Sequence, residues 1–170
     1  QEVRQLNADL EQRVAERTLE AQQARALAEA SRKRVLEITD SVPGVVYEFH
    51  RGHDGSYSFP FANTRILELL GASREAVESD ARTAFAAVFA EDLPGMLEEI
   101  ERSAAGLSEW NYTWRVRDAA SGTVHWLQGR STPSKVESGV LWRGVMTDVT
   151  ESKRLQAELA LAKESADIAR

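Results

Sequence analysis

Side chains able to carry out chemistry are few in this sequence, and they are scattered. The chain has no cysteine, which excludes disulfides, thiolate metal sites and a cysteine nucleophile. Two of the three histidines, His50 and His53, lie around one turn-rich loop. Two ligands without a third make a weak metal site, so solvated loop histidines are the simpler interpretation. His125 alternates with Trp126, so these two side chains face opposite sides of a strand.

The carboxylates do not form an acid–base pair either. Glu98, Glu99 and Glu101 belong to a helical run with apolar residues at positions 93, 97, 100 and 104, which places the three carboxylates largely on the solvent side. The turns "SGT" and "GAS" lack the spacing of a phosphate-binding loop, and no nucleophile is paired with a base. We therefore expect this chain to be non-catalytic.

Composition and charge exclude further classes. The net charge is −6 and no segment is basic, which argues against a nucleic-acid partner. No apolar run reaches the length of a membrane span and the N-terminus has no signal pattern, so we expect a soluble fragment without membrane contact. The lack of cysteine fits a reducing cytoplasm. We expect a cytoplasmic location, and an inner-membrane anchor in a longer parent stays open.

The first 38 residues predict one long helix, because they contain no glycine or proline and are rich in strong helix formers. Two interpretations are open: a solvated helix with a weak stripe, or a parallel two-stranded coiled coil with a soft centre. We favour the coiled coil, since apolar residues recur along a seam at both ends of the helix. The seam consists of Val3, Leu6, Leu10, Val14, Arg17, Ala21, Ala24, Ala28, Ser31, Val35 and Ile38.

Residues 39–150 predict one α+β domain. Pro43 and Gly44 end the long helix, and strands are expected near 45–50 and 56–61. Short helices follow, and then Asp92 is expected to cap a longer helix with an apolar face at 93, 97, 100, 104 and 107. From Trp110 the pattern alternates, as in three strands joined by short turns. This order predicts an antiparallel sheet with helices packed on one face.

Several stretches together resemble the PAS domain, in particular the subgroup with a tryptophan in the penultimate strand and a closing Asp-x-Thr motif. They are "SVPGVVYEF", "FAN", "EDLPGM", "WRVRDAASGTVHWLQGRSTP" and "WRGVMTDVTESKR". The resemblance covers roughly residues 38–154 and implies a five-stranded sheet in the order 2-1-5-4-3. The N-terminal helix and residues 151–170 resemble the linkers of bacterial sensor histidine kinases in two-component signal transduction.

The resemblance also implies that Asp148, Val149 and Thr150 end the sheet and start an outgoing signalling helix. Thr150 is expected to cap this helix by accepting a bond from a first-turn amide, with Glu151 at the positive helix end. Asp148 is expected to pair with an arginine or with freed backbone donors. An ordinary strand-to-helix junction, in which these residues only cap, is the alternative.

For cofactors, the resemblance has negative implications. Light-sensing relatives need a cysteine that forms a flavin adduct, and haem-binding relatives usually take a histidine from the long helix; this chain has neither. We expect no cofactor, although an unknown small ligand stays open. A cavity between sheet and helices would be lined by Phe85, Phe89, Leu97, Ile100 and Trp126, but large aromatic residues at such positions are also ordinary core.

The outgoing helix repeats the seam spacing at Leu155, Leu159 and Ala162. We therefore expect a homodimer through parallel coiled coils, with a kinase domain in cis downstream. The predicted function is a signal-relay module of a sensor histidine kinase. A ligand-binding PAS sensor, a structural spacer, and the PAS module of a diguanylate cyclase are the alternatives.

Overall fold

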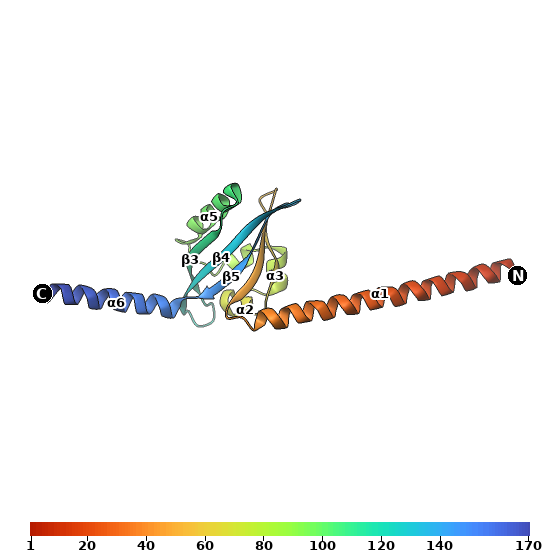
Figure 1. Cartoon of the computed structure of the whole chain (residues 1–170), viewed down its shortest axis with the longest axis horizontal. Helices are drawn as coiled ribbons and strands as arrows, with labels where there is room; N and C mark the ends of the chain where they lie inside the picture. Colours follow the sequence, from red (N-terminus) through yellow and green to blue (C-terminus); the bar gives the residue numbers. More distant parts are fainter. The chain divides into compact units, whose positions relative to one another are not determined.

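The computed structural model describes all 170 residues, which form two compact units, residues 1–38 and 39–170. The first unit is a single helix, α1, which spans Glu2–Asp40 and is drawn from red to orange in Figure 1. Its last two residues belong to the second unit. No helix of the chain combines the length and apolar character needed to cross a bilayer. Large apolar side chains along α1 are exposed, namely Val3, Leu6, Leu10, Val14, Leu19, Leu27, Val35 and Ile38.

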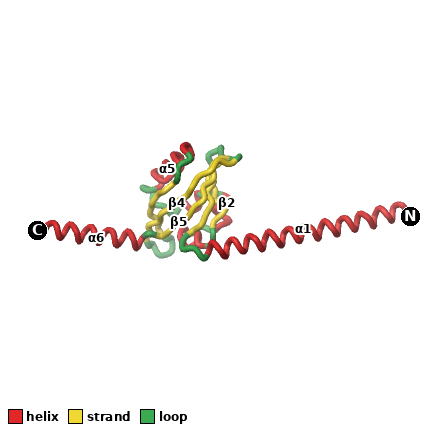
Figure 2. The backbone as a smooth tube through the Cα atoms, in the orientation of Figure 1, coloured by secondary structure: helices red, strands yellow, loops and turns green.

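The second unit is an α+β domain followed by a helix, as expected. Its five strands form one antiparallel sheet in the order β2-β1-β5-β4-β3, shown in yellow in Figure 2, which confirms the predicted topology. In chain order the elements are β1 Val45–Gly52, β2 Tyr57–Ala62, α2 Arg65–Leu70, α3 Arg74–Ser79, α4 Arg82–Phe85, α5 Leu93–Gly106, β3 Trp110–Arg117, β4 Val124–Val136, β5 Gly139–Asp148 and α6 Thr150–Ile168.

The core lies between one face of the sheet and helices α2 to α5. Alternate residues of each strand point into it, as the two-residue period of a strand requires. Phe49 is central, because its ring lies 5.1 Å from that of Phe59 and 5.6 Å from that of Trp142. The buried apolar residues of sheet and helices form one cluster, and these helices therefore cover one face.

Helix α5 buries a face that overlaps the predicted one, because Ile100 is buried and Leu93, Leu97 and Ala104 are partly buried against the core, but the most buried positions differ. Met96, Ile100 and Ser103 are buried, whereas Leu107 is exposed and ends the helix in a left-handed conformation, with φ of 49°. A serine can occupy this core position because its hydroxyl accepts a hydrogen bond of 2.9 Å from the indole N–H of Trp142. The predicted stripe missed this partner, which lies on another element.

Candidate functional site

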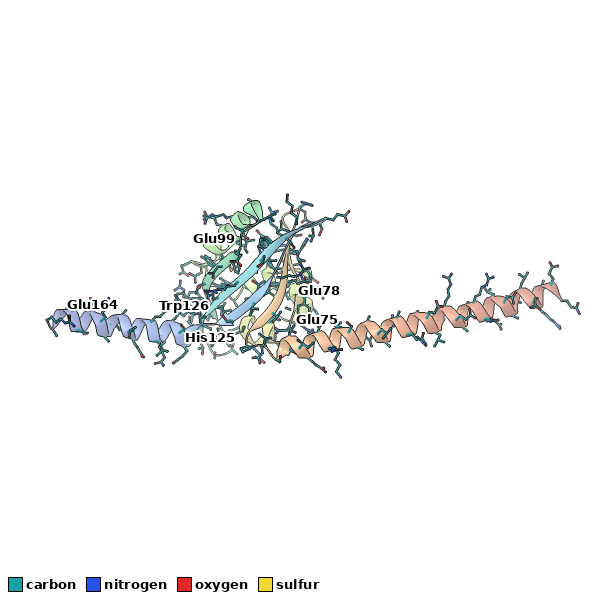
Figure 3. All side chains as sticks on the ribbon, in the orientation of Figure 1. Glu75, Glu78, Glu99, His125, Trp126 and Glu164 are labelled. Carbon is teal, nitrogen blue, oxygen red and sulfur yellow. The ribbon has the colours of Figure 1, made fainter.

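The Asp-x-Thr motif joins β5 to α6 through a compact set of hydrogen bonds. Asp148 Oδ1 accepts bonds from the backbone N–H of Thr150, at 2.9 Å, and from its hydroxyl, while Oδ2 lies 3.0 Å from His125 Nδ1. The Thr150 hydroxyl in turn accepts from the backbone N–H of Trp126 at 2.9 Å. The N–H of Val149 donates to the Trp126 carbonyl at 2.8 Å. The first turn of α6 is therefore tied to β4 as well as to β5; Figure 3 labels His125 and Trp126 beside this helix.

This arrangement corrects the expected role of Thr150. Its side chain accepts no bond from a first-turn amide of α6, and Val149 occupies the N-cap position without a side-chain cap. The reason lies in β4, whose pairing with β5 ends at the pair of Leu127 with Asp148. The N–H of Trp126 beyond that pair needs an acceptor, and the Thr150 hydroxyl supplies it.

Of the two partners expected for Asp148, the structure shows the backbone donor, the N–H of Thr150, and no arginine; His125 takes the place of the arginine. Partial burial alone would raise the pKa of Asp148, yet the hydrogen bonds from Thr150 and His125 outweigh it and hold that pKa below its usual value. The ionised carboxylate is the form that accepts all these bonds. Glu151 lies in the first turn of α6, as expected, and pairs with Arg154 on the same helix.

A second junction, which sequence reasoning missed, holds the end of α1. Asn63 is fully buried, and its side-chain amide donates to the carbonyls of Thr39, at 3.0 Å, and Gly44, at 3.2 Å. The N–H of Thr64 donates to Asp40 Oδ1 at 3.0 Å. Together with the backbone bond from Val42 to the Thr39 carbonyl, these bonds hold the turn after α1 against the residues that follow β2. The available signal was the asparagine of "FAN", directly after a strand.

The two junctions lie at the same end of the two adjacent strands β1 and β5. Val45, the first residue of β1, is paired with Met146, which precedes Asp148 by two residues. Gly44 has a φ of +110°, and a Cβ at this position would lie 2.3 Å from the carbonyl oxygen of Met146. Only glycine permits this approach, so the turn that follows α1 rests directly on the end of β5.

Between sheet and helices lies a cavity of about 40 Å³. Phe85 and Ile100 line it, as expected. Phe89, Leu97 and Trp126 do not, which corrects that part of the prediction. The other lining residues are Tyr47, Phe49, Phe59, Leu70, Ala84, Val88, Met96, Trp110, Trp114, Ser131, Trp142 and Met146.

Strand geometry explains two of these corrections. Phe89 donates its N–H to the carbonyl of Arg115, so the segment before α5 runs along the free edge of β3 and directs Val88 inward and Phe89 outward. On β4, Leu127 is fully buried, so its neighbour Trp126 faces the opposite side of the sheet. Leu97 is partly buried at the margin of the core.

Apolar side chains line most of the cavity, but five of its residues carry polar groups: Tyr47, Ser131, Trp110, Trp114 and Trp142, whose N–H binds Ser103. Burial raises the pKa of Tyr47 to about 12, and its hydroxyl is hydrogen-bonded to Ser131. The indole N–H groups of Trp110 and Trp114 are buried and have no acceptor in the protein. A buried N–H without a partner is uncommon, so an occupant with a hydrogen-bond acceptor would satisfy a need that the fold leaves open.

The two loop histidines, His50 and His53, do not contact the cavity; each is hydrogen-bonded to the turn between β4 and β5. His50 Nε2 lies 2.8 Å from the Ser138 hydroxyl, and His53 Nε2 lies 3.1 Å from the Glu137 carbonyl. Both therefore hold the turn between β4 and β5 against the end of β1. Glu101 accepts bonds from Arg51 and Tyr57, while Arg102 is paired with Glu98 and Glu99 on the surface of α5.

Comparison with known proteins defines the class. The PAS fold family model matches residues 59–147, and the chain belongs to this family. No curated protein sequence matches it.

The fold is also shared with solved structures, at identities that support likeness of fold alone. A sensory box histidine kinase/response regulator from Burkholderia thailandensis E264 has a TM-score of 0.57 and 16% identity, over 77% of this chain and 96% of that one. The N-terminal domain of a diguanylate cyclase with a PAS/PAC sensor, from Marinobacter aquaeolei, has a TM-score of 0.53 and 12% identity, over 65% and 98%. A domain assigned to a light and redox sensing histidine kinase from Haloarcula marismortui has a TM-score of 0.54 and 19% identity, over 69% and 99%.

Proposed function

We propose that this chain is a cytoplasmic, dimeric PAS relay module that passes a conformational change from α1 to α6. One observation carries the proposal: the end of α1 is held by Asn63, which follows β2, the start of α6 is held by bonds to β5 and β4, and Gly44 lies between them against Met146. A displacement of residues 39–44 must therefore move the strand end that carries Asp148. Relay modules of this kind work by shifting between packings of similar energy.

A sensor histidine kinase is the proposed effector. Two of the structural neighbours come from histidine kinases and one from a diguanylate cyclase, and the sequence after Thr150 resembles a kinase linker. The diguanylate cyclase stays the alternative. The parent protein distinguishes them, because a kinase labels itself with phosphate from ATP whereas a cyclase converts GTP to a cyclic dinucleotide.

The dimer is proposed from the exposed seams of both helices. Leu6, Leu10 and Val14 on α1 and Leu155 and Leu159 on α6 are each more than half exposed in the single chain. Their spacing is that of a coiled-coil seam, in which a second copy would cover them. The exposed Ala162 continues the seam on α6.

Charges placed in the seams are expected to dissociate this dimer. Leu10→Asp combined with Leu159→Asp should give the monomer mass of 18.9 kDa in sedimentation equilibrium, whereas the unchanged chain should give twice that mass. The matched control is Leu19→Asp with Leu161→Asp, which changes leucines that are also more than half exposed but lie outside the seams. A parallel, in-register dimer also predicts that Leu10→Cys forms a disulfide with its own counterpart. A monomeric unchanged chain, or equal dissociation by the control pair, would refute the proposed dimer.

A ligand-sensing role is the second candidate, and the two unpartnered indole N–H groups favour it. A cavity of about 40 Å³ suits an occupant of few atoms, with an apolar body and a hydrogen-bond acceptor. Small ketones and amides are therefore expected to raise the melting temperature of the chain, by an amount that increases with the logarithm of their concentration above the dissociation constant. The Trp114→Phe variant, which lacks one donor, should respond less. Identical responses in both proteins, or none in either, would remove this candidate.

A further inference from the structure

Four side chains form a continuous contact on the sheet face opposite the cavity, which we call the cation ladder: Phe89, Arg115, Trp126 and Lys153. Arg115 and Trp126 are cross-strand partners on β3 and β4. The guanidinium carbon of Arg115 lies 4.6 Å from the centre of the Phe89 ring and 5.5 Å from that of Trp126. Lys153 Nζ, from α6, lies 5.2 Å from the centre of the Trp126 ring. Each distance is within the range of a cation–π interaction.

Asp92 joins this ladder to helix α5. Its carboxylate accepts bonds from the backbone N–H of Arg115 at 2.9 Å, from Nε at 2.9 Å and from Nη2 at 2.8 Å. Asp92 was expected to cap α5, yet its side chain makes no capping bond. A charge-assisted, two-pronged bond to a guanidinium is stronger than a bond to a neutral amide, which explains the preference.

The ladder therefore connects the cavity side of the domain to α6. Asp92 directly precedes α5, and Met96 and Ile100 on this helix line the cavity. At the other end, Lys153 lies in the first turn of α6. A shift of α5 changes where Asp92 holds the guanidinium of Arg115, and the guanidinium in turn contacts the ring that Lys153 contacts.

Trp126 is the point where two kinds of attachment to α6 converge. Its backbone N–H and carbonyl bind Thr150 and Val149, and its ring contacts Lys153. We propose that the cation ladder is a coupling element, in which Asp92 and Arg115 position the Trp126 ring and so set how firmly the first turn of α6 is held on the sheet. This route starts at the cavity-lining helix and meets the route between α1 and α6 proposed above at the start of α6, where Trp126 binds Thr150.

Amide hydrogen exchange of the whole chain tests the coupling. Lys153→Met keeps an unbranched side chain, one atom shorter, but removes its charge, and should speed exchange of the amides of residues 153–156 by about two- to fivefold, the equivalent of one exposed cation–π contact. Asp92→Asn should act in the same direction at the same amides. In the double variant, the increase in exchange rate should be much smaller than the sum of the two single increases, because both substitutions break the same linkage.

Controls and a reciprocal measurement complete the design. Asp80→Asn removes a carboxylate that pairs with Arg82 outside the ladder, and Lys163→Met removes a lysine further along α6; both should leave residues 153–156 unchanged. Coupling is reciprocal, so Lys153→Met should also speed exchange at residues 96–99 of α5, a result that does not depend on how Asp92→Asn folds. Unchanged exchange at residues 96–99, or strictly additive effects in the double variant, would overturn the proposal.

Discussion

Trp142→Ala is expected to lower the free energy of unfolding by about 3 to 5 kcal/mol, the usual cost of removing a large buried aromatic side chain. Trp142 is 2% exposed, and its ring packs against Phe49 while its N–H binds Ser103 on α5. The substitution therefore opens a cavity in the middle of the core and leaves the Ser103 hydroxyl without its donor. Urea unfolding followed by circular dichroism measures the effect.

Trp142→Phe separates the two contributions. It keeps a ring against Phe49 and loses the hydrogen bond, so its cost should be clearly smaller than that of Trp142→Ala. If Trp142→Ala lost less than about 1 kcal/mol, the packing of this core as described would be wrong.

Gly44→Ala is expected to destabilise the domain well beyond the ordinary cost of a side chain at positive φ, about 1 to 3 kcal/mol. The added Cβ would meet the Met146 carbonyl at 2.3 Å, so the start of β1 and the end of β5 must separate. Gly55→Ala is the matched control, because Gly55 also has a positive φ, of +81°, but a Cβ there would contact nothing within 4 Å. The difference between the free energies of unfolding of the two variants, measured with urea, gives the contribution of the close approach between residue 44 and the Met146 carbonyl. Equal losses would mean that the approach is unimportant.

The sequence predicted the architecture well, because the evidence for it is local and periodic. The change from helical to alternating spacing at Trp110 located the meander, and Pro43 with Gly44 located the end of α1. The strand order came from the resemblance and not from the spacing, since an alternating pattern does not say which strands are neighbours.

The candidate site was harder to predict, because its contacts join residues far apart in the chain. Asp92 has the position of a helix cap, but Arg115 is 23 residues away and competes successfully for its carboxylate. The alternation of side chains along β4 predicts that Trp126 and its neighbours in the strand point to opposite faces of the sheet. It does not predict which of the two faces the helices cover. Phe89 faces outward only because its segment pairs with the edge of β3. Asn63 is polar, and its buried amide donates to the carbonyls of Thr39 and Gly44, partners that no local pattern reveals.

The central claim is that the end of α1 and the start of α6 are coupled through β1 and β5. Amide exchange at residues 153–156, compared between Gly44→Ala and Gly55→Ala under conditions where both variants stay folded, tests it most directly. The account predicts faster exchange of these α6 amides in Gly44→Ala only, since that change alone displaces the strand that carries Asp148. Equal exchange rates in the two variants would contradict it.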